Sequence, residues 1–145
     1  SVSGSPVVVE AVVPPAPNDV TYFRYLSRVA VLTGLPVVIV TNTGWKTGAT
    51  RKTPLMRVVD GDRYILVASQ GGAPTHPSWY GNLKAEPRVE IRDETKVQAM
   101  RVREVVDEPE RQRLWEIAVR AYPPYQAYQA KTERIIPVFL AEPTA

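Results

Sequence analysis

Short apolar runs, separated by glycine, proline and charged residues, set the pattern of this chain. Two of the runs flank Asp60-Gly61-Asp62, a sequence typical of a tight hairpin turn. Two others flank Asp93-Glu94, which indicates a second hairpin. The pattern predicts six short strands, over residues 37–40, 53–59, 63–69, 89–92, 96–106 and 135–140.

Other stretches carry the spacing and capping residues of helices. We expect helices over 19–33, 77–85 and 108–121, with a further turn or helix at Tyr125 and Tyr128. The first of these helices either packs on the domain or contacts a membrane surface or covers a site.

The order of these elements indicates the fold class. Strands joined by hairpins, which do not alternate regularly with helices, argue against a Rossmann sheet. They favour the α+β class, mainly antiparallel β, as a small barrel with attached helices. Residues 1–17, rich in Ser, Val and Pro, are predicted to form an N-terminal arm, and residues 18–145 a single domain.

Composition narrows the chemistry. The 145 residues contain no cysteine and one histidine, His76, which excludes disulfides, Cys-ligated metals and any site with two imidazoles. Redox activity would therefore need a bound organic cofactor, with no metal. The net charge of +3 is too small to indicate nucleic-acid binding. Because we find neither a membrane-spanning stretch nor a secretory signal, we expect a cytoplasmic protein.

The polar segment after the first predicted strand is the first candidate site. Residues 41–57 contain Lys46, Arg51, Lys52 and Arg57 and no acidic residue. With glycines that expose backbone amides, such a loop can hold a phosphate or a tail of several carboxylates. The alternative is a solvated basic loop.

Three further segments could form a pocket. Residues 68–72 end a strand in a small polar residue and two glycines, where a flat ring can approach the backbone, unless this is only a flexible turn. Trp79 shares a helix face with Leu83, a spacing more often found in a core. His76 is expected to cap the helix or contact the tail of a ligand. Tyrosines three apart near residue 125 form either a packing surface or a wall for a flat, electron-poor substrate.

Taken together, these segments resemble one family. The order and spacing that carry the resemblance are Thr-Gly-Trp-Lys-Thr-Gly-x-x-Arg-x-Thr-Pro-Leu at 43–55, Ala-Ser-Gln-Gly-Gly-Ala-Pro-x-His-Pro-x-Trp-Tyr-x-Asn-Leu at 68–83, Tyr-Pro-Pro-Tyr-x-x-Tyr-Gln at 122–129 and Ile-Pro-Val at 136–138. The chain is similar over residues 19–142 to the deazaflavin-dependent nitroreductases, actinobacterial enzymes that use reduced coenzyme F420. The resemblance implies a split β-barrel related to the flavin-binding, pyridoxamine-oxidase-like barrels. It also implies hydride transfer from C5 of the reduced deazaflavin to quinones, enones or nitro-aromatic compounds.

The resemblance also implies roles for individual residues. It assigns cofactor binding to Trp45, Lys46, Thr47, Gly48, Arg51, Pro54, Leu55, Met56, Ala68, Ser69, Gln70, Gly71, Gly72, His76, Trp79, Tyr80 and Asn82. The substrate-binding residues would be Tyr122, Tyr125 and Tyr128. From the chemistry of hydride transfer we expect Ser69, a tyrosine hydroxyl or backbone amides to meet the negative charge on the acceptor, and Tyr125, Tyr128 or water to give the proton, so Ser69, Tyr125 and Tyr128 are the predicted catalytic residues. Trp45 and Gln70 stand where members usually carry a basic residue, which removes positive charge near the expected tail. Trp45 could stack on the cofactor instead.

Two other functions remain open on the sequence. An FMN-dependent oxidoreductase would use the same barrel, and a non-catalytic protein would bind a cofactor or lipid without turnover. The partners that we expect are a small planar substrate and a second copy in a homodimer, with no nucleic acid. The predicted N-terminal helix would allow peripheral association with the inner face of the cell membrane.

Overall fold

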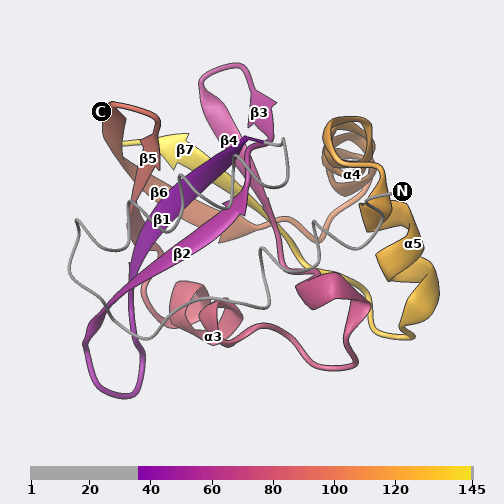
Figure 1. Cartoon of the computed structure of the whole chain (residues 1–145), viewed down its shortest axis with the longest axis horizontal. Coiled ribbons are helices and arrows are strands. Elements are labelled where there is room, and N and C mark those ends of the chain that lie inside the picture. Colours follow the sequence, from indigo (N-terminus) through magenta and orange to yellow (C-terminus); the bar gives the residue numbers. More distant parts are fainter. Residues whose placement is uncertain (1–35, 145) are drawn as a thin grey trace.

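The computed structural model describes residues 36–144, and the predicted arm at 1–17 and helix at 19–33 lie outside this range. Seven strands form one sheet (Figure 1): β1 (Val37–Thr43), β2 (Thr50–Met56), β3 (Val59–Asp60), β4 (Arg63–Val67), β5 (Arg88–Asp93), β6 (Lys96–Glu104) and β7 (Val138–Pro143). The helical elements are the 3₁₀ turn η1 (Gln70–Gly72), α3 (Ser78–Ala85), α4 (Glu110–Ala121) and α5 (Pro124–Lys131). No helix in this range is long and apolar enough to span a membrane.

The strand order is β2-β1-β5-β6-β7-β4-β3, and neighbouring strands pair antiparallel throughout. The sheet curls into a half-barrel, with α4 and α5 beside one another at one side and α3 across one end (Figure 1). The predicted α+β class and split barrel are thus confirmed.

Apolar residues are buried on both faces of β4 and β7, whereas β5 and β6 bury one face and expose the other. In β4, Ile65 and Val67 belong to one buried cluster, which also contains residues of α4 and α5. Tyr64 and Leu66, on the opposite face, belong to a second cluster with residues of α3. Since successive side chains of a strand point to opposite faces, burial on both sides explains why β4 has a continuous apolar run.

The bounds of three strands, β2, β3 and β7, differ from the predictions. Residues 50–52, expected in a loop, belong to β2 because they pair with the end of β1. The predicted strand at 53–59 is interrupted at Arg57 and Val58, which separate β2 from β3. At the other end of the chain, β7 begins at Val138 and not at residue 135.

The helices also differ slightly at their ends. Pro77 has an extended backbone and precedes α3, so it is not the first helical residue. Tyr122 caps the C-terminus of α4, whereas Tyr125 and Tyr128 lie on α5. The three tyrosines therefore come from the junction of two helices, which the two prolines between them create.

Candidate active site

The hairpin between β1 and β2 ends in a compact tip, residues 44–49. Gly44 N donates to Ala49 O and Gly48 N to Gly44 O, each at 2.8 Å, and Gly48 has a φ of 75° that suits glycine. Lys46 Nζ lies 5.3 Å from the centroid of the Trp45 ring, which is 58% exposed. Within residues 36–144, neither Lys46 nor Arg51 forms an ion pair. The tip and the adjoining Arg51 of β2 thus present two exposed positive charges that have no ion-pair partner among the described residues.

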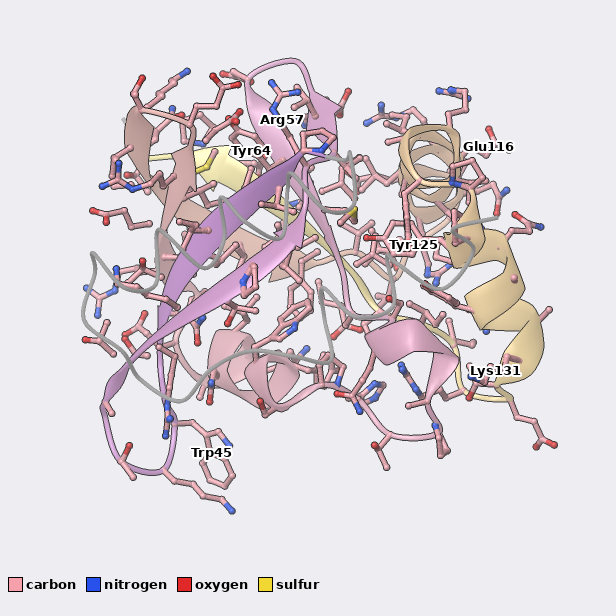
Figure 2. The ribbon with its side chains drawn as sticks, viewed as in Figure 1. Trp45, Arg57, Tyr64, Glu116, Tyr125 and Lys131 are labelled. Carbon is pink, nitrogen blue, oxygen red and sulfur yellow. The ribbon has the colours of Figure 1, made fainter. Side chains whose placement is uncertain are left out.

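Arg57, the last basic residue of segment 41–57, lies away from the tip and has an acidic partner. Arg57 Nε binds Asp93 Oδ2 at 2.8 Å, and Tyr64 donates to the same oxygen at 2.7 Å. These residues lie at the opposite end of the hairpin from Trp45 (Figure 2). Segment 41–57 lacks acids in sequence, but a distant aspartate neutralises Arg57 in space.

Helix α3 holds the tip in place through a chain of buried amides. Trp45 N donates to Asn82 Oδ1 at 3.0 Å, Asn82 Nδ2 donates to Asn42 Oδ1 at 3.2 Å, and Asn42 Nδ2 donates to Val40 O at 3.2 Å. The backbone N–H at one end and the carbonyl at the other fix both amide orientations. A Cβ at Gly81 would lie 3.2 Å from Trp45 Nε1, so the indole packs directly on α3. Asn82 therefore supports the tip, and its part in cofactor binding stays a prediction.

The second part of the candidate site is the turn at residues 69–72, which we call the glycine turn. Ser69 is fully buried, and the next three residues have φ values of 46°, 63° and 81°. Gly72 N donates to Ser69 O at 2.9 Å. A Cβ at Gly72 would lie 2.8 Å from Tyr128 O, so the turn packs against the backbone of α5. The sequence-predicted residues 68–72 are thus held together as one turn.

Sequence reasoning missed Arg134, which binds the glycine turn and its flanks. Its guanidinium donates to Ser69 O at 2.7 Å, to Ala73 O at 2.9 Å and to Ala68 O at 3.2 Å. Gln129 Nε2 donates to Arg134 O at 2.8 Å. No local pattern marks an arginine between a helix and a strand, and only the fold brings it to residues more than 60 positions away.

His76 joins the glycine turn to α3. Its Nδ1 lies 3.0 Å from Arg134 Nη1, and its ring stacks on Tyr80 at 4.3 Å. Because arginine only donates, Nδ1 accepts and the imidazole proton is on Nε2. Burial, and then the charge of Arg134, lower the pKa of His76, which favours the neutral ring. His76 is not the cap of α3, which is Pro77, so that part of the expectation is wrong, and contact of His76 with a ligand tail stays a prediction.

The remaining residues assigned to the ring wall lie in or beside the core. Trp79 is buried and contacts Phe139 with ring centroids 5.9 Å apart, so the packing interpretation of Trp79 is confirmed. Pro54, Leu55 and Met56 are buried residues of β2. Tyr80 donates to Glu104 at 2.9 Å; burial and this hydrogen bond raise the pKa of Tyr80.

The three tyrosines form one buried aromatic cluster. The hydroxyls of Tyr122 and Tyr128 lie 3.0 Å apart, and the centroids of Tyr122 and Tyr125 are 4.8 Å apart. Tyr125, which is labelled in Figure 2, is 2% exposed, and its ring centroid lies 6.3 Å from that of Trp115 in α4. The three rings pack between α4 and α5, and the contact of Tyr128 with Gly72 places the cluster beside the glycine turn; a role as the wall of a substrate pocket stays a prediction.

Comparison with known proteins identifies the family. The model of the family described as F420H(2)-dependent quinone reductase matches residues 20–143, and the chain belongs to this family. An F420H(2)-dependent quinone reductase of Mycobacterium tuberculosis is 42% identical over 105 residues, which are 71% of this chain and 70% of the relative.

Solved structures agree with this assignment. One described as an F420-H2 dependent reductase (FDR-A) is 52% identical, with a TM-score of 0.70, and the match covers 74% of this chain and 94% of that one. A second, described as a domain-swapped dimer, is 44% identical with a TM-score of 0.70 and covers 85% of this chain and 98% of the other. A pyridoxamine 5'-phosphate oxidase-like structure from Listeria innocua, 13% identical with a TM-score of 0.54, shares the fold alone.

Family membership makes the chain an F420H2-dependent oxidoreductase and selects F420 over the FMN alternative. The described residues suit this cofactor. Lys46 and Arg51 offer charge to an anionic tail, and the two glycines of the glycine turn leave its backbone without side chains at those positions. Helix α3 joins the two parts, since Asn82 holds the tip and His76, just before the helix, contacts the arginine of the turn.

Proposed function

We propose that this protein reduces quinones with F420H2, and that the hairpin tip and the glycine turn together bind the cofactor. The observation that carries the proposal is a pair of contacts, one made by α3 and the other by His76, just before the helix. Asn82 fixes the charged tip through Trp45, and His76 contacts Arg134 beside the turn. In Figure 1 the tip and η1 lie on either side of α3. Such an arrangement suits an elongated ligand with a flat ring and an anionic tail.

The tip binds the tail through charge. Lys46 and Arg51 are exposed and not neutralised within the described residues, so they can each bind a phosphate or carboxylate oxygen. Thr47 contributes a hydroxyl, whose oxygen accepts from Ala49 N, and the left-handed turn at Gly48 shapes the loop around it. Trp45, held by Asn82, supplies an aromatic surface where relatives would have a positive charge.

The glycine turn and β2 frame the ring. Gly71 allows close approach to the backbone of the turn, and Gly72 allows the turn to pack against α5, whereas Pro54, Leu55 and Met56 supply apolar support from β2. Ala68, Gln70 and Tyr80 complete this wall. When bound, reduced F420 supplies a hydride from C5 of its deazaflavin.

The tyrosines form the acceptor side. A quinone that gains a hydride and a proton becomes a quinol, so the site must stabilise negative charge on oxygen and deliver one proton. We propose that Ser69, a tyrosine hydroxyl or backbone amides stabilise the charge, and that Tyr125, Tyr128 or water donates the proton. Single-turnover rates of Tyr125→Phe and Tyr128→Phe test this: unchanged hydride transfer and protonation would remove both phenols from the mechanism.

We also propose that the protein is a homodimer, since a relative with 44% identity is described as a domain-swapped dimer. Light scattering of the purified protein tests this, and a monomer mass would contradict it. Association with the inner membrane face through the N-terminal segment remains a separate proposal, tested by sedimentation with anionic vesicles with and without residues 1–35.

The main experiment compares cations at the two ends of the hairpin. Lys46→Gln and Arg51→Gln should each weaken binding of oxidised F420 about tenfold at low salt, and high salt should reduce the difference. Arg57→Gln is the matched control, because Arg57 pairs with Asp93 away from the tip. Oxidation of F420H2 by a soluble naphthoquinone should follow the same ranking in KM for F420H2. Equal effects of all three substitutions would refute the proposed tail site, and absence of quinone-dependent oxidation would refute the acceptor.

A further inference from the structure

The glycine turn adopts a shape that its own sequence does not enforce. Three successive residues, Gln70, Gly71 and Gly72, have positive φ values, and one of them is not glycine. Left-handed backbone is unfavourable for a residue with a side chain and persists where surrounding contacts hold it. Within the turn and its flank, Gly72 N and Ala73 N donate to carbonyls three residues earlier. Further contacts of the turn come from residues 128–134.

Arg134 supplies contacts that no other side chain type could reproduce. Its Nη2, Nε and Nη1 reach the carbonyls of Ser69, Ala73 and Ala68 at 2.7, 2.9 and 3.2 Å. A guanidinium offers five donors in one rigid plane, whereas a lysine ammonium is a point charge on a flexible stem. In a trans peptide the N–H points away from the carbonyl of the same plane. By fixing the carbonyls of Ala68 and Ser69, Arg134 therefore turns the N–H groups of Ser69 and Gln70 to the opposite side.

Arg134 is itself fixed from α5, the helix that carries two tyrosines of the acceptor side. Gln129 donates to Arg134 O at 2.8 Å and accepts from Ile136 N at 2.9 Å, so its amide bridges the loop that carries Arg134. Lys131 Nζ lies 3.5 Å from Gly71 O. Together with the contact between Gly72 and Tyr128, these bonds join α5 and the glycine turn into one unit.

We propose that Arg134 is a positioning residue that holds the glycine turn in the shape that receives the deazaflavin ring, with Gln129 fixing Arg134 in turn. The inference rests on the function proposed above. Arg134 acts through the backbone of the turn, and its contribution to cofactor binding depends on the forked geometry of the guanidinium more than on its charge.

The test measures the Kd of oxidised F420 by fluorescence, with the melting temperature of each variant recorded alongside. Arg134→Gln and Arg134→Lys should both weaken binding about tenfold or more, since each loses several charge-assisted hydrogen bonds. The salt dependence of binding should stay that of the wild type, because the charges of the tip are unchanged. Arg111→Gln is the matched control: Arg111 donates to Ile136 O of the same loop but to no residue of the glycine turn in the hydrogen bonds described here. It should lower the melting temperature without changing Kd.

The outcomes separate this inference from the proposed function. Wild-type protein that fails to bind F420 refutes the proposed cofactor site, whatever the variants do. Wild-type binding together with full binding by Arg134→Lys refutes positioning, because charge alone would then suffice. A loss in Arg111→Gln equal to that in Arg134→Gln would also refute it, since loss of stability alone would explain both. Where Arg134→Gln fails to fold, Gln129→Glu is the second variant. It keeps an acceptor for Ile136 N but loses the donor to Arg134 O. It should weaken binding of F420 about threefold. Unchanged Kd in that variant would count against the inference.

Discussion

Substitution of Gly72 by alanine tests the contact that joins the glycine turn to α5. The new methyl group would lie 2.8 Å from Tyr128 O and 3.0 Å from Tyr128 Cα, both backbone atoms that cannot move aside alone. The φ of 81° adds backbone strain, which costs about 1–2 kcal/mol for an alanine. Overpacking of a close contact adds about 1–3 kcal/mol. We therefore expect Gly72→Ala to lower the free energy of unfolding by about 2–5 kcal/mol.

Gly61 supplies the matched control for this substitution. It has a φ of 67°, and a Cβ there would meet no atom within 4 Å. Gly61→Ala should thus show the strain alone, about 1–2 kcal/mol. At roughly 3 °C for each kcal/mol in a chain of this size, the melting temperature should fall by about 3–6 °C in the control and about 6–15 °C in Gly72→Ala. Circular dichroism measures both. Equal losses in the two variants would show that the turn does not pack against Tyr128 as described.

Three further predictions concern other parts of the molecule. Burial and the hydrogen bond to Asp93 raise the pKa of Tyr64 from 10.0 to about 12. Because the pKa is higher in the folded state, ionisation of Tyr64 favours unfolding. As the pH rises through this range, the free energy of unfolding measured with urea should fall on the order of 2 kcal/mol more in the wild type than in Tyr64→Phe. A constant difference between the two proteins across that range would exclude this coupling. Asn82→Ala removes the acceptor of Trp45 N and the donor to Asn42. It should therefore lower the free energy of unfolding by about 2–4 kcal/mol in chemical denaturation and raise the KM for F420H2. Unchanged stability would contradict the buried amide chain. Tyr122→Phe removes one hydroxyl of a buried pair and should cost about 1 kcal/mol of stability in the same assay, whereas no loss would show that the pair contributes nothing.

The elements that sequence predicted well are those specified by local chemistry. The hairpin at Asp60-Gly61 forms as expected, with Val59 opposite Tyr64, because the turn residues and the flanking apolar runs agree. The break between Tyr122 and Tyr125 follows equally directly from two adjacent prolines. For the candidate site, local spacing was enough to group the tip, the glycine turn and the tyrosines as three separate segments.

What sequence could not predict depends on residues that are distant along the chain. Asp93 lies 36 positions from Arg57, which it neutralises. The sequence of segment 41–57 alone therefore overstates the positive charge that the folded segment presents. Arg134 reaches carbonyls 61 to 66 positions away. The extension of β2 back to Thr50 comes from pairing with β1 and overrides weak local preference. Contacts of this kind are set by the curl of the sheet, which no local pattern encodes.

A crystal structure of the protein with oxidised F420 would test the cofactor site most directly. We expect the phosphate and carboxylates of the tail beside Lys46 and Arg51, and the deazaflavin ring against the glycine turn with Arg134 still bound to the carbonyls of Ser69 and Ala73. A tail bound away from the tip, or a ring that leaves the glycine turn uncontacted, would contradict the proposed site.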